Sequence, residues 1–149
     1  MYKTLKAELK HVEELAVLFN SYRLFYKQEP DAEIAIKFLS ERLGQNESVV
    51  YVTLNSTNEM VGFVQLYPLF SSTRMKKLWL LNDLFVDEKH RGKGISIALI
   101  NKCKELCITT DALGLMLETS KNNMEANKLY QKTGFLLKQD TNYYTWQVT

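Results

Sequence analysis

The sequence has no uninterrupted apolar segment close to the roughly 18 residues that a membrane-spanning helix requires. Its first residues, MYKTLKAELKHVEEL, carry charged side chains where a signal peptide would have its apolar region. Prolines and cysteines are scarce, with two of each in 149 residues. No repeat, low-complexity segment or linker interrupts the chain. These absences predict a soluble, intracellular protein that resides in the cytoplasm.

The two cysteines lack the neighbours that a metal site needs. Cys103 and Cys107 are four residues apart on a predicted helix, so they share one face. No further ligands with suitable spacing lie nearby, and a disulfide is unusual in a reducing compartment. We therefore expect two small buried thiols and no bound metal.

The chain also lacks a strong excess of charge of either sign. Its formal net charge is +2, and the lysines are spread along the sequence rather than gathered in a stripe. This distribution argues against a nucleic acid partner. A length of 149 residues suits one domain, which we expect to span residues 1–149.

Hydrophobic periodicity and turn residues indicate an α+β or mixed α/β fold. The sheet is expected to be mostly antiparallel, with about seven strands, one parallel splayed pair and helices on both faces. Residues 78–119 form a strand–helix–strand unit, which should make the parallel pair through a right-handed crossover. The expected strands are 1–5, 48–54, 60–69, 78–86, 113–119, 135–138 and 143–148. The expected helices are 8–26, 31–43, 93–110 and 122–133.

The segment RGKGIS, residues 91–96, lies where a strand should become a helix. Glycines at positions 92 and 94 allow backbone amides to turn inward and bind an anion, and the helix dipole favours negative charge. An ordinary strand-to-helix turn is the alternative. The complete P-loop and dinucleotide fingerprints are both absent.

Two motifs resemble those of the GNAT acetyltransferase superfamily. RGKGIS is similar to that family's pattern Arg/Gln-x-x-Gly-x-Gly/Ala, except that Ser96 replaces the usual small last residue. Downstream, NNMEANKLYQKTGF resembles Asn-x-x-Ala-x-x-Leu-Tyr-x-x-x-Gly-Phe. The two motifs cover about residues 78–136 together with the strand that precedes them, and they occur in the family's order.

The resemblance implies that acetyl-CoA is the cosubstrate. The backbone of Leu84, Phe85 and Val86 would pair with the amides of the pantetheine arm. The diphosphate would lie on the amides of the glycine segment, namely Arg91, Gly92, Lys93, Gly94, Ile95, Ser96 and Ile97. In the second motif, Asn123 would cap a helix or hold the pantetheine arm, and Ala126 is a further implied cofactor contact.

The resemblance also implies two residues that move protons. Tyr130 would protonate the departing thiolate, or it is simply a core aromatic residue. Asp83 is the candidate base that takes a proton from the attacking amine, and Glu118 is a second candidate. Adjacent strand residues point to opposite faces, so only one of Asn82 and Asp83 faces the cleft unless a bulge intervenes. The alternative is a carboxylate satisfied by neighbouring backbone or lysine groups.

The acceptor side of the site is expected to be aromatic and acidic, which suits an ammonium ion. Helical spacing also allows Tyr22 and Tyr26 to be core residues. The candidate acceptor contacts are Tyr22, Tyr26, Glu29, Tyr67 and Phe70, with Glu118 and Asp31 as further acidic groups.

The function expected from the resemblance is direct transfer of an acetyl group to the primary amine of a small molecule, such as a polyamine or an amino acid. Acetylation of a protein lysine or N-terminus is one alternative, and a non-catalytic acetyl-CoA-binding module is another. The aromatic segment NYYTWQV, residues 142–148, has the composition of an exposed edge strand, so pairing between two copies in a homodimer is a further expectation.

Overall fold

The computed structural model describes residues 1–149. The chain forms two compact units, residues 1–118 and residues 119–149. The first unit contains the whole sheet and three of the four α-helices. No helix is long and apolar enough to cross a membrane.

The sheet has five strands in the order β1-β2-β3-β4-β5. They are β1 (Lys3–Lys6), β2 (Val49–Leu54), β3 (Met60–Ser71), β4 (Lys76–Val86) and β5 (Leu115–Met116). The first four strands are antiparallel neighbours, and β4 and β5 are parallel. The mixed sheet with one parallel pair is therefore confirmed, whereas the expected number of about seven strands is wrong.

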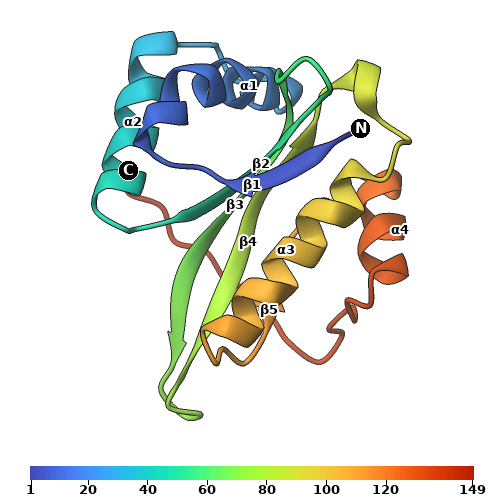
Figure 1. The fold of residues 1–149 in the computed structure, drawn as a ribbon. Coiled ribbons are helices and arrows are strands. Elements are labelled where there is room, and N and C mark those ends of the chain that lie inside the picture. Colours follow the sequence, from blue (N-terminus) through green and yellow to red (C-terminus); the bar gives the residue numbers. More distant parts are fainter. The chain divides into compact units, whose positions relative to one another are not determined.

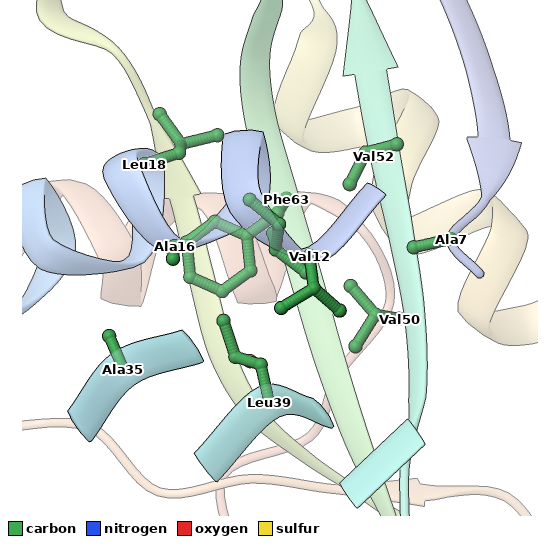
Figure 2. Packing of buried hydrophobic residues seen from close by; sticks show 10 residues of the cluster. Ala7, Val12, Ala16, Leu18, Ala35, Leu39, Val50, Val52 and Phe63 are labelled. Atoms are coloured by element: carbon green, nitrogen blue, oxygen red, sulfur yellow. The ribbon is translucent and has the colours of Figure 1, made fainter. Parts of the chain in front are cut away.

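Two helices cover one face of the sheet (Figure 1). α1 (Val12–Phe25) follows a short 3-10 turn, and α2 (Ala32–Gly44) begins after Asp31. The Asp31 side chain caps α2 by accepting a hydrogen bond from the Ile34 amide at 2.9 Å. Figure 2 shows how these helices bury Phe63 of β3 against Leu39 and Val12.

The third helix, α3 (Ile95–Thr109), covers the opposite face (Figure 1). Val52 of β2 belongs to the core under α1 and α2. The neighbouring Tyr51 faces α3, because burial and the nearby Cys103 and Glu105 of that helix raise its pKa. Trp79 of β4 also faces α3, because its Nε1 donates to the Thr110 hydroxyl at 2.9 Å. Strand alternation thus divides the sheet between two layers of helix.

The parallel pair separates soon after it forms. Only Trp79 and Leu80 of β4 pair with β5, opposite Leu115 and Met116. β4 then continues to Val86 while paired with β3 alone. The edge of β4 beyond Leu80 therefore has no strand neighbour on the β5 side, which is the splayed arrangement expected from the sequence.

The second unit contains α4 (Met124–Lys132), and the residues that follow form no strand. The strands expected at 135–138 and 143–148 are therefore wrong. A segment rich in β-branched and aromatic residues forms a strand only where it can pair with a neighbouring strand and pack against an apolar surface. Here Tyr143, Tyr144, Trp146 and Val148 are each at least 75% exposed, so no such surface covers them.

Candidate functional site

The glycine segment forms an open turn between β4 and α3. Gly92 and Gly94 have φ angles of 73° and 80°, a left-handed conformation that favours glycine. A Cβ built on either residue would meet no atom within 4 Å. Their absent side chains therefore leave the backbone of this turn accessible to a ligand.

The amides of this turn have few partners within the protein. Those of Gly92, Lys93 and Gly94 make no backbone hydrogen bond, and the first bond of α3 runs from the Ala98 amide to the Gly94 carbonyl at 3.0 Å. The amides at the start of α3 thus point out of the helix end, where the dipole attracts an anion. Ser96 is half-buried at the second position of α3. This set of donors fits the diphosphate of coenzyme A.

Two basic side chains flank the turn and fold back on the chain. The Arg91 Nε donates to the Val86 carbonyl at 3.0 Å, and the Lys93 Nζ donates to the Lys89 carbonyl at 3.2 Å. The Arg91 guanidinium also lies 5.8 Å from the ring centroids of both Phe25 and Phe85. Arg91 therefore connects the glycine turn to the end of β4 and to α1.

The backbone expected to pair with pantetheine lies at the separated end of β4. Leu84, Phe85 and Val86 are half-buried and follow the last residue that pairs with β5. An open strand edge leaves amide and carbonyl groups that an extended amide-containing chain can satisfy. The edge of β4 and the glycine turn belong to the same unit, and only residues 87–90 separate them in the sequence.

A β-bulge determines where Asp83 points. Gln65 of β3 pairs with Asp83, whereas the next residue, Leu66, pairs with Leu81, so Asn82 is the extra residue of β4. The bulge reverses the alternation of side chains from this point. Asp83 consequently faces α1, although Trp79 on the same strand faces α3.

Asp83 is a buried carboxylate whose partners are all neutral. It is 5% exposed, and it accepts hydrogen bonds from Gln65 Nε2 at 2.8 Å and Asn82 Nδ2 at 3.0 Å. Tyr22 of α1 provides a further hydrogen bond. Burial raises the pKa of Asp83, and these three hydrogen bonds only partly oppose the effect. A carboxyl group in this state can accept a proton more readily than an exposed one.

Tyr22 and Tyr26 lie beside Asp83 on the same face. Their ring centroids are 4.9 Å apart, and the ring of Tyr22 also packs edge-on against Phe63 and Phe85. Tyr22 is half-buried, and Tyr26 is 50% exposed at the end of α1. The pKa of Tyr26 is raised by burial and by the charge of Asp83. These two tyrosines therefore form an aromatic surface that extends from the carboxylate to the exterior.

Tyr67 belongs to the same neighbourhood. Burial, with a further contribution from the Asp83 charge, raises the pKa of Tyr67 to about 12, while Arg42 of α2 opposes the increase. Tyr67 is two residues beyond Gln65 on β3, so both side chains lie on the face that Asp83 occupies. The structure thus brings Tyr22, Tyr26 and Tyr67 together around Asp83.

The remaining acceptor candidates lie elsewhere or make no contact with this group. Phe70 is 74% exposed and pairs with Lys77, whose Nζ lies near the rings of Phe70 and Trp79 on the α3 face. Glu29 is exposed between α1 and α2, where the Asp31 carboxylate serves as the helix cap. Glu118 is exposed two residues after β5.

The residues of the second motif lie in the unit formed by residues 119–149. Asn123 caps α4, because its Oδ1 accepts a hydrogen bond from the Ala126 amide at 3.2 Å. Tyr130 is half-buried, and its ring packs edge-on against Phe135 with 5.5 Å between centroids. The helix cap is therefore confirmed, and the cofactor and proton-transfer roles of this motif stay predictions.

Sequence reasoning did not single out Gln65. It is fully buried, yet it carries a polar amide within the apolar run VGFVQLY. One sequence pattern could have indicated Gln65. It is the only strongly polar residue of an apolar strand segment, and the next strand along the chain contains the pair Asn82-Asp83.

Comparison with known proteins places the chain among acetyltransferases. A family model described as the acetyltransferase (GNAT) family matches residues 9–135. The chain is 38% identical to the uncharacterized N-acetyltransferase YhfO of Bacillus subtilis over 138 residues, which are 93% of this chain and 91% of that protein. It is 33% identical to a probable acetyltransferase of Haemophilus influenzae over 135 residues, covering 91% of this chain and 90% of that protein. A solved structure, the crystal structure of a probable acetyltransferase, superposes with a TM-score of 0.94 at 36% identity over 99% of this chain and 98% of that chain.

Proposed function

Because the chain belongs to the GNAT family of acetyl-CoA-dependent N-acetyltransferases, we propose that it acetylates the primary amine of a small cationic molecule, such as a polyamine or an amino acid. Family membership confirms the resemblance found in the sequence motifs and supports an enzyme rather than a non-catalytic module. The identity of the acceptor is the part that we propose.

The observation that carries this proposal is the buried carboxylate of Asp83, whose hydrogen-bond partners are all neutral. A buried carboxylate is normally paired, because an isolated charge is costly in a poorly solvated environment. The aromatic rings of Tyr22 and Tyr26 lie beside it and favour a cation. We infer that the ammonium group of the acceptor is the missing partner.

Asp83 then acts as the base that makes the acceptor reactive. An alkylammonium ion with a pKa of about 10.4 is almost entirely protonated at neutral pH, so it must lose a proton before it can attack. Asp83 takes that proton, directly or through water, and its raised pKa suits the task. Glu118 is the second candidate for this role.

Tyr130 is the proposed acid on the leaving-group side. Its hydroxyl gives a proton to the thiolate of coenzyme A as the bond between sulfur and the acetyl carbon breaks. Two protons leave the acceptor nitrogen, one to Asp83 before the attack and one to solvent after it. The sulfur receives one proton from Tyr130, which recovers a proton from solvent. The products are the acetylated amine, the free thiol and the proton taken by Asp83, which is then released. A thiol pKa of about 8.5 makes this protonation favourable at neutral pH.

Direct transfer, without an acetylated enzyme, is the proposed route. Burial and the neighbouring Cys107 raise the pKa of Cys103 to about 12, and burial also raises the pKa of Cys107. A thiol must ionise to act as a nucleophile, so neither side chain suits a covalent step. Free, buried cysteines also support a cytoplasmic location.

The cofactor would be held by the open turn and the edge of β4. Acetyl-CoA supplies the thioester that is the source of the acetyl group. The amides of residues 91–97 would bind its diphosphate, with Arg91 and Lys93 as flexible cations. The backbone of Leu84, Phe85 and Val86 would bind the pantetheine arm, together with Asn123 and Ala126 of the second motif.

A screen for thiol release tests the acceptor class. The purified protein and acetyl-CoA are mixed with polyamines, amino acids or lysine-containing peptides, and the free thiol is measured over time. We expect turnover with small cationic amines and a large loss of kcat/KM in the Asp83→Asn variant. Turnover with peptides alone would instead favour a protein acceptor.

A homodimer that forms through the C-terminal segment is also proposed. Tyr143, Tyr144, Trp146 and Val148 are exposed, and so much apolar surface favours burial against a second copy. Light scattering of the full chain and of the Trp146→Ser variant tests this assembly. A monomeric wild-type protein would contradict it.

A further inference from the structure

Gln65 is a fully buried amide at the centre of β3, opposite Asp83 in the register of the sheet. Its Nε2 donates to Asp83 Oδ2 at 2.8 Å, and both side chains are buried. The pair joins neighbouring strands at the point where the bulge of Asn82 directs Asp83 toward α1.

The other end of the Gln65 amide has no partner. Its Oε1 is buried and accepts no hydrogen bond. Such an acceptor typically reduces the stability of a folded protein, and an apolar side chain of the same length would avoid this loss. Stability therefore does not explain why an amide occupies this position, and the hydrogen bond to Asp83 is the contact that does.

We propose that Gln65 is a positioning residue of the acceptor site, which fixes the orientation of the Asp83 carboxylate and keeps it charged for the incoming ammonium group. This inference rests on the proposed function, because it concerns the same carboxylate. The inference adds Gln65 to the acceptor site as a residue that acts through Asp83 and contacts neither acetyl-CoA nor the amine.

A neutral donor suits this role better than a cation. A lysine or arginine at the same place would form an ion pair with Asp83 and would compete with the ammonium group of the acceptor. A carboxylate can accept about four hydrogen bonds. Gln65, Asn82 and Tyr22 provide three of them, which leaves one position for the substrate or a water molecule.

The groups that face Asp83 come from three elements. Tyr22 and Tyr26 approach from α1, and Tyr67 from β3. Arg42 of α2 acts on Tyr67 and is not among the groups that act on Asp83. With no cation acting on Asp83, the loss of one hydrogen bond from Gln65 should be visible in its titration.

The test uses the Gln65→Met variant of the full chain. This substitution removes the amide and keeps an unbranched side chain. The titration of the Asp83 carboxyl is followed by carbon-13 NMR without substrate, and its signal is assigned by its loss in Asp83→Asn. We expect the pKa of Asp83 to rise by about one pH unit, as for the loss of one hydrogen bond to a charged group. The acid limb of the pH profile of kcat/KM should also move to higher pH by about one unit. At pH values below the pKa of Asp83, kcat/KM should therefore fall about tenfold.

Thr53→Val is the matched control. Thr53 is also fully buried, and its hydroxyl bonds to that of Thr4 at 2.9 Å on the β1 side of the sheet. The Thr53→Val variant loses one partly buried side-chain hydrogen bond in the same sheet without touching Asp83. The control should therefore leave both the Asp83 titration and the pH profile unchanged.

An unchanged Asp83 titration in a folded Gln65→Met protein would overturn the inference. If the titration moves while the pH profile does not, Gln65 still positions Asp83, but Asp83 is not the base, so the proposed function fails separately. Should Gln65→Met not fold, Gln65→Glu provides the test. Two carboxyl groups at this distance should titrate in two separated steps, and a single unaltered step would reject the proposal.

Discussion

The hydroxyl of Tyr2 and the Nδ1 atom of His90 lie 3.0 Å apart, although 88 positions separate them in the sequence. Their rings also meet edge-on, with 5.9 Å between centroids. His90 is the last residue of a second short 3-10 turn, Glu88–His90, which leads directly into Arg91 and Gly92. The first residues of the chain are thereby attached to the glycine turn, whose amides are the proposed binding site of the diphosphate.

We predict that Tyr2→Phe weakens the binding of acetyl-CoA. The ring contact is retained and one hydrogen bond is lost, which typically corresponds to about a two- to tenfold increase in Kd. The physical reason is that the turn before Gly92 becomes less well fixed. Isothermal titration calorimetry with acetyl-CoA measures the effect.

Thr4→Val is the control for this prediction. It removes a hydroxyl from the same N-terminal segment, but its partner is Thr53 of β2 rather than the turn. We expect little change in Kd. Equal losses in the two variants would show that the N-terminal strand acts only through general stability.

Gly94→Ala is predicted to reduce both stability and cofactor affinity. Gly94 precedes α3 with φ at 80°, where a Cβ is strained although space is available. The strain amounts to roughly 1–2 kcal/mol in the free energy of unfolding. Thermal unfolding measures the loss of stability, and calorimetric titration with acetyl-CoA measures the loss of affinity.

Two further variants separate backbone strain from other effects. Gly94→Asn should recover part of the loss, since asparagine tolerates the left-handed conformation. Gly44→Ala at the end of α2 should have no such cost, because the added Cβ would have only Leu9 Cδ2 nearby at 3.9 Å. If Gly94→Ala behaves like Gly44→Ala, the turn does not require its glycine.

The helices and most strands follow from local patterns, and the site follows only in part. The period of apolar residues and the Asp31 cap determine α1 and α2, so their expected bounds agree with the structure to within a few residues. The two glycines and the following helix likewise predict the open turn between β4 and α3, whereas phosphate binding at that turn stays a prediction. These features depend on residues close together in sequence.

The features that sequence reasoning missed depend on contacts between distant residues. The partnership of Gln65 and Asp83 requires the register of β3 with β4, which the bulge at Asn82 shifts. The hydrophobic periodicity within either strand does not predict which residues of the two strands pair. The strands expected at 135–138 and 143–148 failed for the same reason, because β-formers need a receiving edge.

Asp83→Asn is predicted to make the protein more stable at neutral pH than the wild type. Burial raises the pKa of Asp83 above its ordinary value of 3.8, so the folded protein binds this proton more tightly than the unfolded chain. The wild type therefore loses stability as pH rises from about 3.8 through the folded-state pKa. The advantage of the variant in Tm should grow over that interval and remain constant above it.

Asp111→Asn provides the comparison. It removes the same charge from an exposed carboxylate that pairs with Lys76 at 2.8 Å, and exposed pairs contribute little. Its Tm should stay close to that of the wild type. A constant difference between Asp83→Asn and the wild type from pH 3 to pH 8 would show that Asp83 is not held in a destabilised charged state.

Tyr130→Phe is predicted to lower kcat while leaving the affinity for acetyl-CoA nearly unchanged. The substitution keeps the edge-on contact with Phe135 and removes only the hydroxyl. A positioned acid contributes about 10²–10⁴-fold to turnover, and solvent can replace part of it, so we expect a loss of about ten- to a thousandfold. Tyr144→Phe, an equivalent change at a side chain that is 85% exposed, should have no effect. Equal turnover of Tyr130→Phe and wild type, with Tm preserved, would remove this hydroxyl from the reaction and assign the proton to solvent.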